Sequence, residues 1–288
     1  MYLNDAIPLL HGSGTEPYNI VEFTRGADAF DYDNNGNITE DRSWKLADIF
    51  HSEPALVSTP PDSISATQSK SDAYYRHIKN YQGFKTSQTN RVPIILAGSN
   101  AGMLHAFHVE TGVEKWSFIP PSMLSKLRNV VSSNANQTNA IYGVDGSPLV
   151  KDIYYDGAWK TIAMFGLGKG GNAYSALDIT DTENPLHLFS FMNDPVRQKA
   201  YYWNADGFKT EHDYSGGSID SNYDYRKLGE AWSTPRIIRM KIDGNDKWVG
   251  IFGAGFNNNV TSAVGSAVFV IDMEDGGKTI NVIDVTDN

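Results

Sequence analysis

Cysteine is absent from the 288 residues of this sequence. Its absence excludes a disulfide framework and every metal site built on thiolates. Long apolar runs are absent too: the longest, around Ile94–Gly98 and Trp248–Phe256, are only as long as strands, whereas a helix needs roughly 20 apolar residues to span a bilayer. The first residues, Met1–Asp5, lack the basic and apolar segments of a secretory signal. The chain is therefore either cytosolic or a segment whose export signal lies upstream, and the motifs below favour the second interpretation.

Positive charge is scarce. The sequence has 24 Lys and Arg against 34 Asp and Glu, a net charge of −10, which argues against a nucleic-acid or anionic-membrane surface because phosphates would be repelled. This charge suits a calcium-binding protein or a well-solvated surface. Hydrophobic residues make up 40% and charged residues 20%, as in ordinary globular domains. Aromatic residues, at 12%, favour strands, and 26 Gly and 12 Pro supply many turns.

One block recurs three times along the chain. Each copy has an apolar strand, a glycine turn and a second apolar strand that ends near an acidic residue or a histidine, and each follows a Ser/Thr-Pro element. The copies are Arg91–Trp116, Trp159–Asp181 and Trp248–Asp272, preceded by Pro54, Pro148 and Pro235. Proline suits the first residue of a strand, where its missing N–H does little harm. Each repeat therefore predicts three or four antiparallel strands, the content of one propeller blade.

The sequence thus predicts an all-β chain with about three blades of a partial, modified β-propeller. Three copies are too few to close a ring of 4–8 blades. The predicted divisions are a loop-rich N-terminal segment at 1–45 and a propeller at 46–288, with blades at roughly 46–121, 142–193 and 228–288. Polar insertions at Thr59–Asn90, Ser122–Tyr142 and Asp194–Lys227 separate the strands, and helix is expected only around Ser122–Arg128.

An Asp/Asn-rich loop is the sharpest local signal for a metal. From Asp31 onward, acidic and amide residues alternate, with Gly36 sixth and Ile38 eighth, as in EF-hand calcium loops. The twelfth residue is Arg42 instead of the usual Glu, so Thr39, Glu40 or Asp41 would supply the missing oxygen. We predict a Ca²⁺ site whose ligands are Asp31, Asp33, Asn35, Asn37, Thr39 and Asp41. An Asn/Gly-rich turn without an ion explains the same residues equally well. The absence of an evident helix pair argues against a complete EF-hand.

Three further motifs favour structural roles. Gly166–Gly171 fits the dinucleotide pattern G-x-G-x-x-G, but the residues that follow predict a strand where a helix is needed, which indicates a blade turn. His105 and His108 are three apart in a strand, so they face opposite sides and cannot share a metal. Tyr201–Trp203 lies in a polar insertion and is interpreted either as a recognition surface or as a surface loop packed on the next blade.

Seven blocks, in order, resemble the propeller domain of the type IV pilus-associated PilC/PilY family. They are Arg25-Gly26, Arg42–Pro54, Gly98–Phe107, Val144–Pro148, Gly157–Thr161, Leu228–Pro235 and Lys247–Phe256. The resemblance implies a quinoprotein-like propeller from a large exported protein at the cell surface, pilus tip or outer membrane. Two residues depart from the family pattern: Ala47 replaces a usual Gly, and His108 replaces a usual Asp.

The resemblance implies a non-enzymatic factor for pilus biogenesis and adhesion. Its partners would be pilus subunits or assembly proteins and a host or abiotic surface ligand. The alternative is a fragment of a quinone-cofactor (PQQ-type) dehydrogenase, because Thr111–Trp116 resembles the element by which those enzymes dock their blades. That element is architectural, and no cofactor-binding set can be assembled from the sequence.

Overall fold

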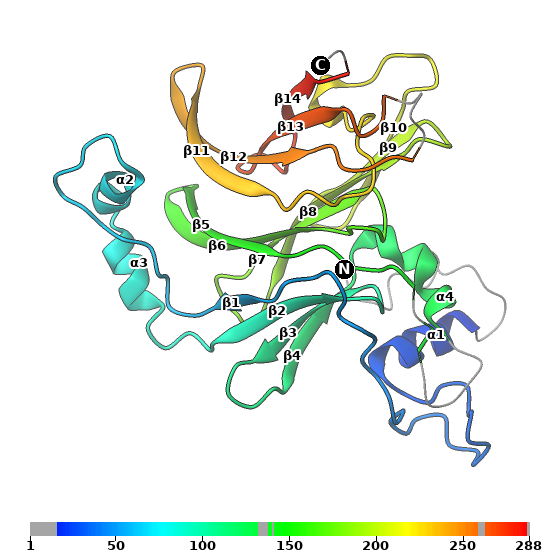
Figure 1. The fold of residues 1–288 in the computed structure, drawn as a ribbon. Helices are drawn as coiled ribbons and strands as arrows, with labels where there is room; N and C mark the ends of the chain where they lie inside the picture. The colour runs from blue at the N-terminus through cyan, green and yellow to red at the C-terminus, as the bar shows by residue number, and fades with distance from the viewer. Residues whose placement is uncertain (1–15, 132–137, 140, 259–262, 287–288) are drawn as a thin grey trace.

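Three antiparallel sheets, stacked face to face, make up most of the computed structural model, which describes residues 16–131, 138–139, 141–258 and 263–286 (Figure 1). The first sheet contains β1 (Ala55–Val57), β2 (Ile94–Ser99), β3 (Met103–His108) and β4 (Glu114–Phe118). The second contains β5 (Leu149–Tyr155), β6 (Ala158–Gly166), β7 (Ala173–Asp178), β8 (Leu186–Asp194), β9 (Lys199–Trp203) and β10 (Lys209–Asp213). The third contains β11 (Arg236–Ile242), β12 (Asn245–Gly253), β13 (Ala267–Asp272) and β14 (Thr279–Asp284).

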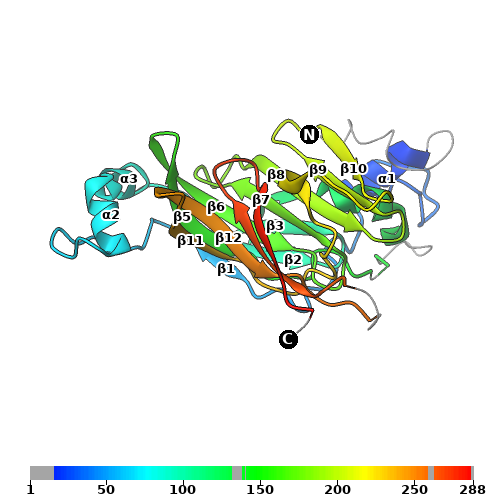
Figure 2. The ribbon, with the colours of Figure 1, turned by 90° about the horizontal axis from the view of Figure 1, so that it is seen from above.

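Each sheet pairs its strands in chain order, which is the topology of a propeller blade. The three sheets correspond to the three predicted repeats. The first strand of each sheet begins directly after the proline of its repeat. Figure 2 shows the sheets layered over one another. In the described residues they form an open array, as the repeat count predicts.

Apolar side chains fill both gaps between neighbouring sheets, because alternate residues of each strand point to opposite faces. Between the first and second sheets, Leu96 and Leu104 pack in one cluster with Phe165. Between the second and third, Tyr174 lies 4.4 Å, centroid to centroid, from Phe252. Trp116 of β4 also donates its indole N–H to the carbonyl of Thr182, 2.8 Å away, beyond β7. The predicted docking role of the Thr111–Trp116 element is therefore confirmed.

The repeats meet at equivalent positions. His51, Asp145 and Trp232 each lie three residues before the proline of their repeat. His51 Nδ1 lies 2.6 Å from a carboxylate oxygen of the buried Asp145, and its ring lies 5.1 Å from that of Trp232. This one sequence position thus joins all three sheets.

A helical insertion contacts all three stacked sheets. The sequence did not predict these helices. Between β1 and β2, residues of the predicted polar insertion form α2 (Asp72–Ile78) and α3 (Tyr81–Ser87), which extend from one end of the sheets (Figure 1). The carbonyl of Lys79, just after α2, accepts a 2.8 Å hydrogen bond from the indole of Trp159 in the second sheet. Asp72 pairs with Arg239 of the third sheet at 2.9 Å. The insertion therefore ties all three blades together.

The second sheet runs past the predicted boundary at residue 193. Strands β9 and β10 extend it to six strands, so the prediction of a surface loop over Tyr201–Trp203 is wrong. All three aromatic side chains are buried. Pairing with β8 and burial on both faces override the polar composition of this stretch. A short 3₁₀ helix, η3 (Ser221–Tyr223), follows.

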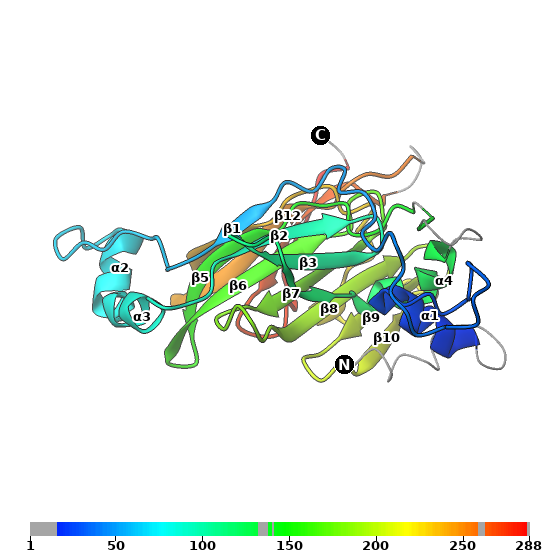
Figure 3. The ribbon, with the colours of Figure 1, turned by 90° about the horizontal axis from the view of Figure 1, so that it is seen from below.

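The described part of the N-terminal segment holds one helix, α1 (Glu16–Arg25); the predicted segment's residues 1–15 lie outside the described ranges. Ile20 and Val21 of α1 pack against Leu124 and Leu127. The latter two belong to η2 (Pro121–Lys126) and α4 (Leu127–Val130), which confirm the helix expected around Ser122–Arg128. Figure 3 shows α1 beside α4, at the end of the sheets away from α2 and α3.

Candidate cation site in the N-terminal loop

The loop after α1 is closed at its base by backbone pairing. Ala27 and Asp41 form an antiparallel bridge, with Asp28 N–H donating to the Glu40 carbonyl at 2.8 Å. Inside the loop, the Asp31 carboxylate accepts a hydrogen bond from Gly36 N–H at 3.1 Å, and Gly36 has a φ of +82° that favours glycine. The loop is therefore ordered by its own side chains.

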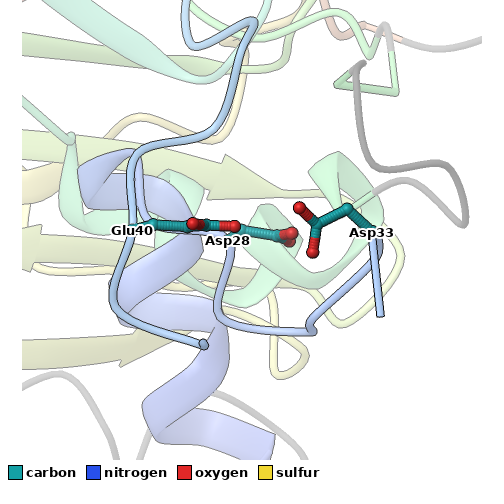
Figure 4. A group of neighbouring side chains, drawn as sticks. All are labelled: Asp28, Asp33 and Glu40. Atoms are coloured by element: carbon teal, nitrogen blue, oxygen red, sulfur yellow. The ribbon is translucent and has the colours of Figure 1, made fainter. Parts of the chain in front are cut away.

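Three carboxylates converge above this base: those of Asp28, Asp33 and Glu40. One oxygen from each lies within 4.8 Å of the others, and Figure 4 shows the three groups gathered together. Such a set repels itself unless a cation or a donor lies between its members. An all-oxygen set of this kind suits a hard divalent cation such as Ca²⁺.

Asp28 is the residue that distinguishes this cluster from an ordinary acidic surface. Its side chain is 5% exposed, and its Oδ2 accepts a hydrogen bond from Tyr32 N–H at 3.0 Å. Its Oδ1 is buried without a hydrogen-bond partner. A buried, unpaired carboxylate oxygen is costly, and a bound cation would offset that cost.

The amide of Asn35 bridges the other two carboxylates. Its Nδ2 lies 2.9 Å from Asp33 Oδ2 and 2.7 Å from Glu40 Oε1. The amide N–H groups thus occupy the position between acids that a cation would take. Rotation of this amide would direct its carbonyl oxygen, a calcium ligand, toward the same space.

The six residues predicted from the sequence do not all face this cluster. Asp33 contributes a carboxylate and Asn35 bridges it, whereas Asp31 turns to Gly36. Asn37 Oδ1 accepts from Thr39 N–H at 3.2 Å, which places both residues in a local turn. Asp41 points outward, 83% exposed, to pair with Lys45 at 2.8 Å.

Asp28 was missed because it precedes the EF-hand pattern, and Glu40 was only one of three candidates for the missing oxygen. No sequence signal marks Asp28, because its backbone pairing with Glu40 across the loop base is visible only in the structure.

Arg42 explains the lost twelfth ligand. Its side chain turns inward, with the guanidinium carbon 3.7 Å from the centroid of the Phe23 ring and a hydrogen bond to the Trp44 carbonyl at 2.8 Å. Burial lowers the pKa of Arg42, and the nearby negative charge of Asp28 opposes that shift. Arg42 therefore anchors the loop to α1, and the carboxylate that reaches the cluster from this end of the loop is that of Glu40.

A serine–histidine–glutamate alignment in the first sheet is structural. Ser99 Oγ lies 2.8 Å from His105 Nε2, and His105 Nδ1 lies 2.6 Å from Glu114 Oε1. The order matches a hydrolase triad, but Ser99 is 1% exposed and no substrate could reach it. The hydrogen bond with His105 lowers the pKa of Glu114. His108 accepts hydrogen bonds from Glu110 N–H and Thr111 N–H in the following turn, so the two histidines have different partners.

The glycine-rich stretch Gly166–Gly171 is followed by β7, as the sequence predicts. Added Cβ atoms at Gly168 and Gly170 would lie within 3.1 Å of neighbouring backbone atoms, and Gly168 has a φ of +57°. These glycines allow a tight turn between repeats, and a dinucleotide site is not formed because no helix begins there.

Comparison with known proteins decides the family. The model of the PilY1 beta-propeller domain matches residues 48–288, most of the chain. The chain belongs to the PilY1 β-propeller family. Both the resemblance stated from the sequence and the predicted all-β propeller fold are thereby confirmed.

The PilY1 relatives are much longer than this chain. The type IV pilus biogenesis factor PilY1 of Pseudomonas aeruginosa (strain UCBPP-PA14) is 30% identical over 256 residues, which cover 88% of this chain and 19% of that protein. A PilY1 homolog from Xylella fastidiosa (strain Temecula1 / ATCC 700964) is 33% identical over 223 residues, 77% of this chain and 15% of that protein. The chain therefore spans a fifth or less of these relatives.

A solved PilY1 structure shares the fold. The crystal structure of the Pseudomonas aeruginosa PilY1 C-terminal domain matches with a TM-score of 0.53 at 26% identity, covering 81% of this chain and 37% of that chain. Among the described residues, no helix combines the length and the apolar character needed to cross a membrane.

Proposed function

We propose that this chain is a non-enzymatic binding module of a factor for type IV pilus biogenesis and adhesion. The match of residues 48–288 to the PilY1 propeller carries the proposal. Its partners are pilus subunits or pilus assembly proteins, with a host or abiotic surface ligand in the adhesive role. It is exported and acts at the cell surface, at the pilus tip or the outer membrane. The stacked sheets form a rigid scaffold whose loops carry recognition.

Deletion of residues 48–288 from the full-length gene tests the pilus role. Surface pili, counted by electron microscopy, are expected to be lost while the shortened protein is still exported. Normal piliation in a strain that exports the shortened protein would sink the proposal.

The second part of the proposal is that Ca²⁺ binds at Asp28, Asp33 and Glu40 and tunes this binding. The unpartnered, buried oxygen of Asp28 supports it. A cation there would hold the loop against α1 through the base that Arg42 anchors. A ligand that favours one arrangement shifts the population toward it.

Isothermal titration with Ca²⁺ tests the site with a matched pair of variants. Asp33→Asn or Glu40→Gln should weaken calcium binding at least tenfold, because each removes a charged ligand. Asp41→Asn removes an equal charge from the same loop outside the cluster and should leave affinity nearly unchanged. Equal loss in all three variants would show a diffuse charge effect in place of this site.

The quinone-dehydrogenase alternative rests on the Thr111–Trp116 element. In this chain that element docks one sheet on the next through Trp116, a role that needs no cofactor. Turnover of an alcohol with added quinone and Ca²⁺ would favour the alternative and contradict the non-enzymatic proposal.

A further inference from the structure

The loop after α1 contains Asn35-Gly36, the only place in the sequence where glycine follows asparagine. In this dipeptide an asparagine most readily loses its side-chain amide, because glycine has no side chain to keep its backbone nitrogen away from the amide carbon. Both residues are exposed. A Cβ added to Gly36 would meet no atom within 4 Å, so the space beside this peptide bond is open to water.

Asn35 is held in the geometry that this reaction needs. Its Oδ1 accepts a hydrogen bond from the N–H of Asn37 at 2.7 Å, which folds the side chain back over its own backbone. In such a turn the side-chain carbonyl carbon lies against the peptide nitrogen of the next residue, here Gly36. The Asn37 N–H is also placed to stabilise negative charge that develops on Oδ1.

A carboxylate lies beside the nitrogen that would attack. The N–H of Gly36 donates to both oxygens of Asp31, at 3.1 and 3.2 Å. Asp31 is therefore placed to accept the proton that Gly36 must lose before its nitrogen can form a new bond. The group that would leave, Asn35 Nδ2, lies 2.9 Å from Asp33 Oδ2 and 2.7 Å from Glu40 Oε1.

We propose that Asn35 is a self-modification site, at which the loop converts the asparagine amide into a carboxylate. Asp31 takes the proton of the Gly36 N–H, the Gly36 nitrogen bonds to the side-chain carbon of Asn35, and the bond from that carbon to Nδ2 breaks. The leaving group takes the proton from Asp31 by way of water and departs as ammonia, which leaves a succinimide ring. Water then opens the ring: its hydroxyl joins one of the two carbonyl carbons, and a proton returns to the Gly36 nitrogen. The product is aspartate or isoaspartate, with one new carboxylate.

The conversion adds a fourth acid to the three carboxylates shown in Figure 4. Before it, the Asn35 amide donates to two of them; after it, a negative charge takes the place of that amide. Like charges repel at this distance, so the calcium-free loop loses stability. A divalent cation, in contrast, gains a charged ligand. This consequence rests on the proposed calcium site, whereas the conversion itself does not.

Incubation in water enriched in heavy oxygen tests the conversion. The folded full-length protein is kept at neutral pH in this water and is then digested with trypsin in ordinary water. Cleavage after Arg25 and Arg42 releases the loop as one peptide. Fragmentation mass spectrometry locates the heavy oxygen, which marks conversion that occurred before digestion. We expect it at Asn35.

Asn37 is the internal control in the same peptide. It makes the same kind of turn, because its Oδ1 accepts from Thr39 N–H at 3.2 Å. The residue that follows it is Ile38, whose branched side chain shields the backbone nitrogen. We expect no heavy oxygen at Asn37.

A pair of variants tests the role of Asp31. Asp31→Asn keeps an acceptor for the Gly36 N–H but cannot take its proton, and should slow conversion by roughly tenfold or more. Asp41→Asn removes an equal charge from the same loop, where Asp41 pairs with Lys45, and should leave the rate unchanged. The parent chain unfolded in urea gives the rate of the dipeptide without the loop, and the folded protein should exceed that rate. This last comparison decides the question even if Asp31→Asn fails to fold.

Asn35→Asp reproduces the aspartate product. In calorimetric titrations it should bind Ca²⁺ roughly tenfold more tightly than the parent, because a charged ligand replaces a neutral one. In EDTA it should melt at a lower temperature than the parent. Asn34→Asp is the matched control: it adds the same charge one residue away, where the side chain donates to the Tyr32 carbonyl, and should change both properties less.

No heavy oxygen at Asn35, equal amounts at Asn35 and Asn37, an unchanged rate in Asp31→Asn, or slower conversion in the folded protein than in urea would each overturn the proposal. The calcium site and the pilus role would then be unaffected, because neither requires the modification. Conversion of Asn35 without any change in calcium affinity would support the modification and contradict the proposed calcium site.

Discussion

At the scale of single residues, the unpaired oxygen of Asp28 has a consequence for stability without calcium. Asp28→Asn removes a buried charge and keeps the shape of the side chain. We expect the calcium-free protein to be stabilised by about 1–3 kcal/mol, because one buried oxygen of this carboxylate has no hydrogen-bond partner. Added Ca²⁺ should then raise the melting temperature less than in the parent. Thermal unfolding in EDTA and in excess Ca²⁺ measures both effects, and a destabilised calcium-free variant would contradict this account of Asp28.

A second residue makes stability depend on pH. Burial lowers the pKa of His187 to about 4, and its Nε2 lies 2.9 Å from Ser190 Oγ. The unfolded chain, with an ordinary histidine, binds the proton first as pH falls. The contribution of neutral His187 to the free energy of unfolding is therefore complete above pH 6.5 and is lost between pH 6.5 and pH 4. About 2 kcal/mol of it is lost at pH 5.

Urea unfolding at pH 7 and pH 5 measures this loss. In His187→Gln the difference in the free energy of unfolding between pH 7 and pH 5 should shrink by about 2 kcal/mol, since glutamine does not titrate. An identical pH dependence in the variant and the parent would show that other groups cause it.

Residue patterns predicted only part of the candidate cation site. The alternation of Asp and Asn placed the loop and two of its members, Asp33 and Asn35. Asp28 lies outside that pattern, and its place in the cluster depends on hydrogen bonds with Tyr32 and Glu40 that no local spacing encodes. Arg42 looked like a lost ligand, whereas packing on Phe23 makes it the anchor of the loop.

At the scale of elements, the repeats share a hydrogen bond that can be tested blade by blade. Ser52 Oγ accepts from Gly98 N–H at 2.9 Å in the first blade, and Ser233 Oγ accepts from Gly253 N–H at 3.0 Å in the third. Ser52→Ala leaves a buried N–H unpaired and should cost about 1–2 kcal/mol. Ser233 is less buried, so Ser233→Ala should cost less. Denaturant unfolding measures both losses of stability. A larger loss for Ser233→Ala than for Ser52→Ala would contradict this prediction.

The second blade has Gly146 at this position. A Cβ there would lie 2.5 Å from the carbonyl oxygen of Gly166, so Gly146→Ala should cost about 1–3 kcal/mol through overpacking. Gly216→Ala is the control, because its added Cβ would meet no atom within 4 Å. Similar stability of the two variants would show that the backbone of the second blade moves away from the added methyl group at no cost.

Elements defined by proline, glycine and alternating apolar residues were predicted; those defined by distant contacts were not. The first strand of each blade begins directly after the proline of its repeat. The short helices α2 and α3 were missed because helices of 7 residues have little local stability and depend on packing against other blades. Strands β9 and β10 were missed because buried tyrosines in a polar stretch also suit a loop.

At the scale of the whole molecule, the helical insertion links blades that are far apart in sequence. Tyr75 of α2 lies 6.1 Å from the ring of Trp159 and 6.2 Å from that of Trp248, with Arg239 4.2 Å from its centroid. We expect Tyr75→Ala to cost about 2 kcal/mol, since it removes a half-buried aromatic ring at this junction. Tyr74→Ala, which removes the neighbouring ring outside this junction, should have little effect. Tryptophan fluorescence during urea unfolding measures the stability of both variants. Equal losses of stability would argue against a role for Tyr75 in holding the blades together.

The contacts of the helical insertion also affect the order of folding during synthesis on the ribosome. Domains fold as the ribosome releases them, amino-terminal parts first, and each blade is built from neighbouring hairpins that close quickly. Asp72 and Arg239, however, are 167 residues apart. The helical insertion leaves the ribosome long before its last docking surface exists, and its aromatic residues stay uncovered until the third blade emerges. We therefore expect folding to be slowest and most prone to aggregation in the interval between synthesis of the first blade and synthesis of the third.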